Sequence, residues 1–134
     1  MTLVDTNVLL DLATNDPRWV DWSIRHLESA SSRGPLIINE ISYAELSVRF
    51  SRIEEVDGFL GNGGFEVVAT PRAALFLAGK VFRTYRERGG ARTGVLPDFL
   101  LGAHAAVAGL VLLTRDTGRY RSYYPTVALI TPEP

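Results

Sequence analysis

The sequence predicts an α/β fold, a three-layer α/β/α sandwich around a central parallel sheet of about five strands. Short runs rich in Val, Ile and Leu recur along the chain, and stretches with helical spacing of apolar residues separate them. These runs are apolar throughout, which is typical of parallel strands that helices cover on both faces. Because the chain has 134 residues, 46% of them hydrophobic, we expect a single domain over residues 1–134 with one core.

Each expected strand is an apolar run bounded by Gly, Pro, Asn, Asp or Thr. In a parallel sheet of this class, ligands bind beyond the carboxyl ends of the strands, at the point where the strand order reverses. An order of 3-2-1-4-5 makes the first, second and fourth strands neighbours. The expected strands cover residues 2–4, 36–38, 65–68, 111–113 and 127–130.

Caps and apolar spacing predict the helices of the N-terminal half. A helix is expected to begin near Asn7, directly after the first strand. The next helix has Asp16 as its N-cap and Pro17 at its first position, where a proline leaves no hydrogen bond unmade. Two shorter helices are expected over about residues 42–50 and 52–60.

The helices of the C-terminal half follow from the same signals. The glycine-rich stretch at 61–64 breaks the chain before the third strand. Thr70 is the expected cap of a long helix whose apolar residues recur at helical spacing as far as Tyr85. Pro97 begins a further helix over residues 98–109, and its apolar, small-residue composition predicts that it is buried on most sides.

Composition excludes several classes of protein and site. The 14 Lys and Arg residues and 15 Asp and Glu residues give a net charge of −1, so no overall attraction to nucleic acid or to an anionic membrane is expected. The absence of cysteine excludes disulfides and thiolate metal sites and favours a reducing compartment. No secretory signal pattern and no apolar run long enough to span a bilayer is found. We therefore expect a cytoplasmic protein with no membrane partner.

Four acidic residues lie where the predicted sheet should bind a ligand. Asp5 directly follows the first strand, and Asp116 stands just past the fourth. Asp98 is in the first turn of the buried helix that leads into the fourth strand, and Glu45 lies one turn into the helix after the second. If these strands are neighbours, the four carboxylates converge on one rim of the sheet.

Clustered carboxylates require a compensating positive charge. At about 5 Å, two carboxylates repel each other by roughly 3 kcal/mol at an effective dielectric constant near 20. With no cysteine and neither histidine at metal-ligand spacing, the oxygen ligands point to Mg²⁺ or Mn²⁺ rather than zinc. A water bound to such an ion is a competent nucleophile for phosphodiester hydrolysis, so no nucleophilic side chain is needed.

Each acid also has an ordinary structural interpretation. Asp5 is a suitable N-cap for the helix that follows it. Ser42 and Glu45 match the spacing of a capping box. Asp98 is favoured in a first helical turn by the helix dipole, and Asp116 is a common turn residue. These interpretations stay open for each residue alone, and the coincidence of all four on one rim favours the metal site.

The motifs LVDTNVLLDL, ISYAEL, LPDFLLGAHA and VLLTRDTGRY, in this order, closely resemble the PIN-domain family, and within it the VapC-type toxins of bacterial toxin-antitoxin pairs. The resemblance covers almost the whole chain and implies an Mg²⁺- or Mn²⁺-dependent endoribonuclease that cuts single-stranded tRNA, rRNA or mRNA. It assigns catalysis and metal binding to Asp5, Glu45, Asp98 and Asp116, and a supporting role to Asn7 and Thr114.

The resemblance also implies partners: a cognate VapB-type antitoxin whose C-terminal segment blocks the active site, and a second copy of the chain in a homodimer. Glu40 is a rival for the second acid, but the family pattern places that acid before a Leu, as Glu45 is. Two alternatives remain, a non-toxin PIN nuclease in RNA processing and a receiver-like, Mg²⁺-binding phosphoacceptor switch. The switch fits poorly because no Asp ends the third strand and no Lys follows the fifth.

Basic residues supply candidate contacts to RNA phosphates. Arg115 and Arg119 flank Asp116, and Arg92 lies in a glycine-rich loop after the long helix. The cations near the end of that helix, from Lys80 to Arg88, fit a solvated helix end. Both histidines, His26 and His104, are interpreted as packed side chains.

Overall fold

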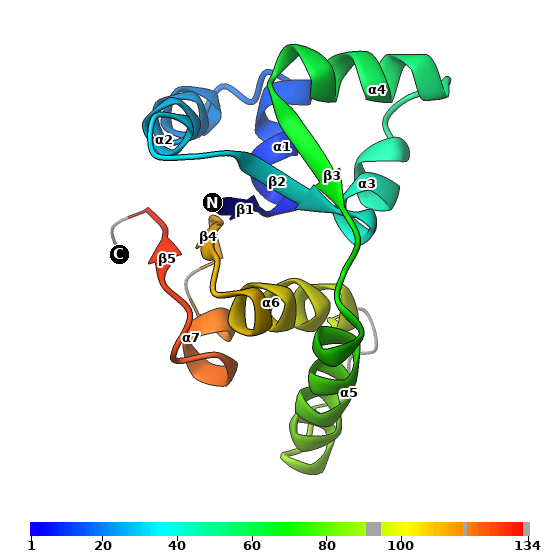
Figure 1. Ribbon diagram of the computed structural model, residues 1–134, viewed down its shortest axis with the longest axis vertical. Coiled ribbons are helices and arrows are strands. Elements are labelled where there is room, and N and C mark those ends of the chain that lie inside the picture. Colours follow the sequence, from blue (N-terminus) through cyan, green and yellow to red (C-terminus); the bar gives the residue numbers. More distant parts are fainter. Residues whose placement is uncertain (91–94, 117, 133–134) are drawn as a thin grey trace.

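The computed structural model describes residues 1–90, 95–116 and 118–132 of the chain. Within them, one five-stranded sheet has the order β3-β2-β1-β4-β5 (Figure 1), and every strand pair is parallel. The predicted α/β class and strand order are therefore confirmed. The strands are β1 (Thr2–Val4), β2 (Leu36–Asn39), β3 (Phe65–Val68), β4 (Val111–Leu113) and β5 (Leu129–Ile130).

Helices cover both faces of the sheet. α1, α2 and α4 lie above it in Figure 1, and α5, α6 and α7 lie below it. No helix within the described ranges is both long and apolar enough to cross a membrane. The helices are α1 (Thr6–Ala13), α2 (Val20–Ser31), α3 (Glu40–Ser47), α4 (Ile53–Asn62), α5 (Arg72–Glu87), α6 (Leu96–Ala108) and α7 (Arg119–Tyr123).

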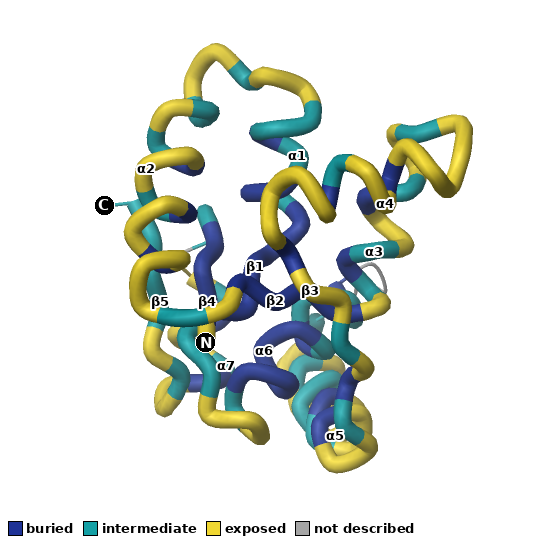
Figure 2. The backbone as a smooth tube through the Cα atoms, turned by 45° about the horizontal axis from the view of Figure 1, so that its top comes forward, coloured by how far each residue is buried: buried dark blue, intermediate teal, exposed yellow. Residues whose placement is uncertain are grey.

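The sheet divides the expected core into two hydrophobic clusters. Leu3 and Leu112 pack with side chains of α5, α6 and α7. Their chain neighbours Val4 and Leu113 pack with side chains of α1, α2, α3 and α4, because successive strand residues point to opposite faces. All four are fully buried, and Figure 2 shows the central strands as the buried interior. Burial on both faces explains why the strands are apolar throughout.

The second helix begins later than the sequence predicts. α2 starts at Val20 and not at Pro17. The carboxylate of Asp16 accepts hydrogen bonds from the backbone amides of Arg18 (2.8 Å) and Trp19 (3.0 Å). Asp16 therefore stabilises a turn that precedes the helix. Asp side chains often bind nearby backbone amides in this way, and these local hydrogen bonds compete with helix formation.

The C-terminal half departs from the predictions at three places. Pro71 is the N-cap of α5, while Thr70 donates to the carboxylate of Glu40 and does not cap that helix. Sheet pairing in β5 covers two residues, whereas 127–130 is expected. Sequence reasoning does not predict α7, because five residues are too few to show a helical period.

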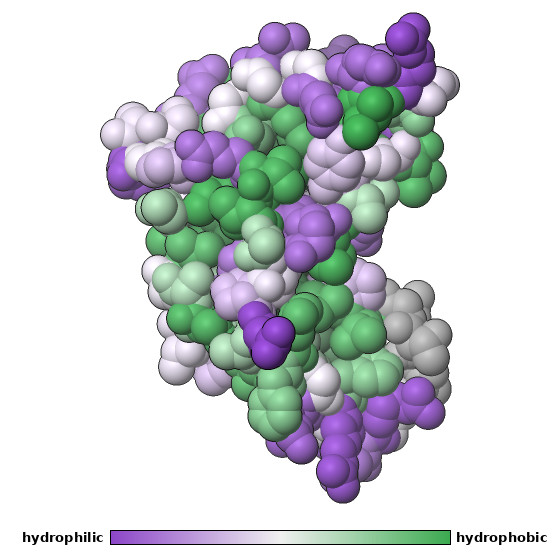
Figure 3. Space-filling model, turned by 45° about the vertical axis from the view of Figure 1, so that its right-hand side comes forward, coloured by the Kyte–Doolittle hydropathy of each residue, from purple (hydrophilic) through white to green (hydrophobic). Residues whose placement is uncertain are grey.

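Hydrophilic side chains gather at the lower tip of the molecule in Figure 3, over the C-terminal end of α5. Arg83 forms an exposed ion pair with Glu87 (3.0 Å) there, and Arg86 lies over the ring of Phe82. This arrangement fits the solvated helix end that the sequence predicts.

Candidate active site

A pocket of about 460 Å³ opens beyond the carboxyl end of β1. β1 pairs with β2 on one side and with β4 on the other, so the strand order reverses beside it, and this is the position at which open α/β sheets bind ligands. Three of the four predicted acids line the pocket. Its lining residues are Asp5, Thr6, Asn7, Leu10, Glu45, Val48, Arg49 and Asp98.

Asp5 occupies the N-cap position of α1, but its side chain does not cap the helix. Its Oδ2 atom accepts hydrogen bonds from the Thr114 hydroxyl (2.7 Å), the Tyr120 hydroxyl (3.1 Å) and the Asn7 amide (3.4 Å). Two of these donors, Thr114 and Tyr120, are distant in sequence and reach Asp5 only in the folded chain. These three side-chain donors all meet Oδ2, and none of them binds Oδ1.

Burial of Asp5 perturbs its ionisation. Only 6% of the residue is exposed, and this desolvation raises the pKa of Asp5 from 3.8 to about 6. The hydrogen bond from Thr114 opposes the shift, the charge of Asp98 adds to it, and the hydrogen bond from Tyr120 opposes it. At neutral pH the carboxylate is charged at a cost, which a cation in the pocket would offset.

Glu45 does not form the capping box that its spacing with Ser42 suggests. Asn39 is the N-cap of α3, and its side chain accepts from the backbone amides of Ile41 and Ser42, each at 3.1 Å. Glu45 instead accepts a hydrogen bond from the Thr6 hydroxyl at 2.7 Å, which links α3 to α1 at the pocket. The capping interpretation of Glu45 is therefore wrong.

Asp98 and Asp116 are joined through an arginine. Nη1 of Arg119 lies 2.5 Å from Oδ2 of Asp98 and 3.8 Å from Oδ2 of Asp116. Burial raises the pKa of Asp98, the Arg119 charge lowers it, and the charges of Asp116 and Glu45 add to the increase. Oδ1 of Asp116 accepts from the backbone amides of Gly118 (3.0 Å) and Arg119 (3.2 Å), so Asp116 also serves as the turn residue of its alternative interpretation.

The two predicted supporting residues connect the acids. Thr114 is fully buried, and its hydroxyl donates to Asp5 and accepts from the backbone amide of Asp116 at 3.0 Å. The Asn7 carboxamide lies 3.4 Å from the Thr114 hydroxyl and accepts from the backbone amide of Arg115 at 3.3 Å. Together they fix the loop after β4 against the end of β1.

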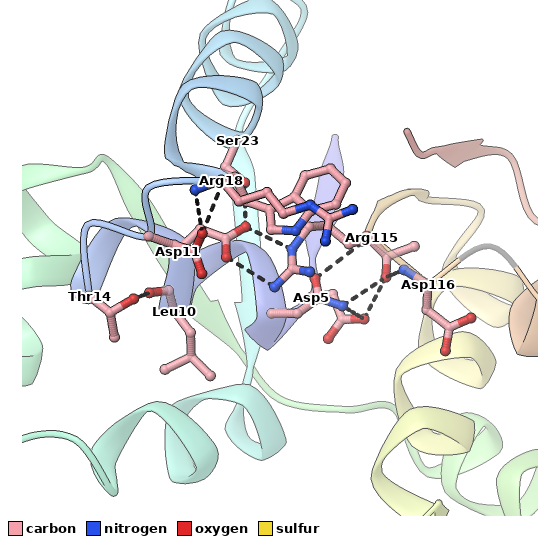
Figure 4. A network of polar contacts seen from close by, with 12 residues as sticks. Asp5, Leu10, Asp11, Thr14, Arg18, Ser23, Arg115 and Asp116 are labelled. Atoms are coloured by element: carbon pink, nitrogen blue, oxygen red, sulfur yellow. Dashed lines mark hydrogen bonds and ion pairs between the residues drawn. The ribbon is translucent and has the colours of Figure 1, made fainter. Parts of the chain in front are cut away.

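Arg115 forms a buried ion pair on the other side of that loop. Its guanidinium binds both carboxylate oxygens of Asp11 (Figure 4), at 2.9 and 3.0 Å. It also lies over the Trp19 ring, 5.0 Å from the ring centroid. The Ser23 hydroxyl completes the environment of Asp11 at 2.7 Å. The guanidinium is thus engaged by Asp11 through two of its nitrogens, while 27% of the Arg115 side chain is exposed. Its predicted contact to an RNA phosphate stays a prediction. The third predicted contact, Arg92, lies outside the described residues.

The remaining candidates lie outside the pocket lining. Glu40 accepts hydrogen bonds from Thr70 and is not among the residues that line the pocket, so Glu45 fits the second acid better. His104 is 3% exposed, and its Nδ1 lies 3.2 Å from the amide nitrogen of Asn39, so it is a packed side chain as predicted.

Sequence reasoning misses two side-chain contacts near the pocket. Tyr120 reaches Asp5 because α7 packs closely on α6 at Gly102, where an added Cβ would lie 2.3 Å from the Tyr124 ring. A glycine inside an apolar helix is a signal of such a close approach. Asp11, a lone acid in the apolar run LLDLA, is a comparable signal of a buried, paired charge.

The chemistry of the pocket fits a hard divalent cation. The donors are carboxylate oxygens of Asp5, Glu45 and Asp98, the ligand type that Mg²⁺ and Mn²⁺ prefer. Among the residues that the structure describes, no three acidic or histidine side chains already stand close enough to hold one ion. Glu45 is bound to Thr6 and Asp98 to Arg119, so these two side chains must turn before they bind an ion together with Asp5.

The fold is shared with solved toxin-antitoxin structures. VapBC2 of Rickettsia felis, bound to a DNA fragment from their promoter, is similar with a TM-score of 0.75 and 18% identity over 98% of both chains. A toxin-antitoxin complex from Klebsiella pneumoniae is similar with a TM-score of 0.69 and 21% identity, over 99% of this chain and 98% of that one. DNA-bound VapBC of Salmonella typhimurium is similar with a TM-score of 0.69 and 20% identity, over 97% of this chain and 96% of that one. At these identities the likeness concerns the fold.

Sequence comparison identifies the family. Among curated proteins no match to the chain is found. The family model of the PIN domain, however, matches residues 2–123, which include all four predicted acids and the whole pocket. The chain therefore belongs to the PIN domain family.

Proposed function

We propose that the chain is a divalent-metal-dependent endoribonuclease that cuts single-stranded RNA and acts as a VapC-type toxin. The observation that carries the proposal is the convergence of Asp5, Glu45 and Asp98, from three separate segments, on one pocket at the carboxyl end of β1. Membership of the PIN domain family supports nuclease activity. We further propose that residues 1–134 act as a single nuclease domain.

The residues of the pocket position the acids for this chemistry. The hydroxyls of Thr114 and Tyr120 fix Oδ2 of Asp5, so its other oxygen is oriented without further loss of side-chain freedom. Thr6 restrains one oxygen of Glu45. Bound Mg²⁺ or Mn²⁺ would supply an activated water and neutralise charge on the scissile phosphate. Asp116 would act from the rim, beside Asp98, and not from the pocket lining.

Partners follow from the same proposal. The similar structures from Rickettsia felis, Klebsiella pneumoniae and Salmonella typhimurium are toxin-antitoxin complexes, which supports a VapB-type antitoxin as the partner of this chain. An antitoxin that covers the pocket would exclude RNA from the acids. Assembly as a homodimer stays a prediction that size measurement in solution can test.

Cleavage of RNA by the purified protein tests the proposal. Activity should require Mg²⁺ or Mn²⁺, cease with a chelator, and fall at least about a hundredfold in Asp5→Asn and Glu45→Gln, because each removes a carboxylate from the pocket. The matched control is Glu40→Gln, which neutralises an acid of the same helix as Glu45 outside the pocket. Cleavage that survives both chelation and Asp5→Asn would reject the metal mechanism.

The same preparation distinguishes the alternatives. Growth arrest on expression, relieved by a co-expressed antitoxin, is expected of a toxin, whereas RNA cleavage without growth arrest would indicate a non-toxin PIN nuclease. Stable phosphorylation of an Asp by a small phosphodonor, with no cleavage of RNA, would indicate a receiver-like switch instead.

A further inference from the structure

Arg119 places a positive charge between two of the four predicted metal ligands. It comes from α7, and its guanidinium contacts Asp98 of α6 at 2.5 Å and approaches Asp116 at 3.8 Å. Asp98 in turn lines the pocket with Asp5 and Glu45. Arg119 therefore neutralises the negative charge of Asp98 at the same side of the pocket where a bound metal ion would neutralise it.

We propose that Arg119 is a resident counter-cation that a divalent ion must displace from Asp98, so that Arg119 sets the metal affinity of the site. The inference rests on the proposed function, because it assumes that the pocket binds a metal. Its physical basis is competition: one carboxylate oxygen cannot donate its charge fully both to a guanidinium and to an ion, and the two cations repel each other.

The arrangement around Arg119 allows this exchange. Its side chain is 27% exposed and that of Asp98 is 35% exposed, so solvent can replace the contact when it breaks. Asp116 is 31% exposed and stays anchored through Oδ1 to backbone amides of the same turn, which leaves Oδ2 as a second partner for the displaced guanidinium. Movement of a flexible side chain, without movement of a helix, is sufficient.

The competition also accounts for the separation of the carboxylates. No three acidic or histidine side chains in the described part of the chain are assembled as ligands of one ion. Although Asp98 lines the pocket with Asp5 and Glu45, its Oδ2 is engaged by Arg119 of α7. Release of Asp98 from Arg119, together with a turn of Glu45 away from Thr6, is then the rearrangement that completes the ligand set.

Arg121 provides a matched control on the same helix. It carries the same charge two residues away, its residue is exposed, and its guanidinium contacts the Thr131 hydroxyl at 3.2 Å. Neutralising Arg121 therefore removes the same charge from the same helix without breaking the contact to Asp98.

Mn²⁺ binding to the metal-free protein tests the proposal. Free Mn²⁺, followed by electron paramagnetic resonance, should show about tenfold tighter binding in Arg119→Gln than in the wild type, and a change of less than about twofold in Arg121→Gln. Arg119→Lys keeps the charge but loses the planar fork, so its affinity should lie between those of the wild type and Arg119→Gln. This variant serves the test if Arg119→Gln fails to fold.

The Mn²⁺ dependence of thermal unfolding gives a second readout, because loss of a purely structural contact would lower the melting temperature equally with and without the ion. Arg119→Gln should melt below the wild type in chelator, because Asp98 and Asp116 lose their shared cation, and the difference should close in saturating Mn²⁺, because the ion takes over that charge. Equal deficits with and without Mn²⁺ would show that Arg119 only fixes α7 to α6, and would overturn the proposal.

The outcomes separate this inference from the proposed function. Mn²⁺ binding that is intact in the wild type but equal or weaker in Arg119→Gln would overturn the role of Arg119 and leave the metal nuclease standing. Absence of Mn²⁺ binding in the wild type and in both Arg119 variants would overturn both.

Discussion

Replacing Arg115 with methionine should destabilise the chain by about 3 kcal/mol, because it leaves the buried carboxylate of Asp11 without its cation. Methionine keeps much of the length and packing of the arginine stem over Trp19 but none of its hydrogen-bond donors. The change therefore isolates the ion pair that ties the loop after β4 to α1.

The magnitude follows from the geometry of the pair. Only 2% of the Asp11 side chain is exposed, and both of its oxygens accept from the guanidinium, at 2.9 and 3.0 Å. Breaking a buried pair on one side costs about 3–5 kcal/mol. The lower end applies here, because Arg115 is 27% exposed and the Ser23 hydroxyl still donates to Asp11.

Urea unfolding at pH 7 in chelator measures this cost. The design is a double-mutant cycle of Arg115→Met, Asp11→Leu and the double variant, with Arg121→Met as the control for loss of an exposed arginine. The double variant should be more stable than the sum of the single effects predicts, because no charge then remains buried. The control should shift stability by less than about 0.5 kcal/mol.

Two results would refute this reasoning. One is a loss of less than about 1 kcal/mol in Arg115→Met, which would mean that the carboxylate of Asp11 does not depend on the guanidinium. The other is an effect on RNA: if Arg115 contacts phosphate, the variant should lower the slope of log affinity against log salt concentration by about 0.7, the value for one contact to a single strand. The structure predicts an unchanged slope.

Further predictions concern the pocket and the packing behind it. The folded, metal-free chain holds the proton of Asp5 more tightly than the unfolded chain, since the pKa rises from 3.8 to about 6. Ionisation of Asp5 therefore lowers the free energy of unfolding. The cost is absent below about pH 4 and reaches roughly 3 kcal/mol above about pH 6. In chelator, Asp5→Asn should be more stable than the wild type at pH 7.5 and similar to it at pH 4 in urea unfolding; an equal offset at both pH values would contradict this. Gly102→Ala should cost about 1–3 kcal/mol, because its Cβ would meet the Tyr124 ring at 2.3 Å. The control is Gly79→Ala in α5, where the new Cβ would meet no neighbouring atom within 4 Å, so the change should be neutral or stabilising by up to about 1 kcal/mol. Similar losses of stability in both variants would contradict the close packing of α7 on α6.

The elements that bury continuous apolar runs were predictable from sequence. Leu3 and Val4 belong to opposite clusters of the core, and a strand with both faces buried must be apolar at successive positions. Helix starts were less predictable, because Asp16 and Asn39 each have more than one backbone amide to accept from. Which turn or helix they close depends on the surrounding packing.

The convergence of three predicted acids on one pocket was also predictable, but the contacts around them were not. The rim rule for parallel sheets brings Asp5, Glu45 and Asp98 to one pocket without any knowledge of side-chain direction. The partners of the two arginines depend on pairs far apart in the chain: Arg115 binds Asp11, 104 positions away, and Arg119 binds Asp98, 21 positions away. Local sequence carries no signal for such pairs.

A crystal structure of the protein with Mn²⁺, using the anomalous signal of the metal, would show whether the acids of the pocket bind a divalent ion. We expect an anomalous peak in the pocket, within direct coordination distance of Asp5 and Asp98, with the guanidinium of Arg119 displaced from Asp98. A crystal grown in saturating Mn²⁺ that shows no peak among these carboxylates would contradict this expectation.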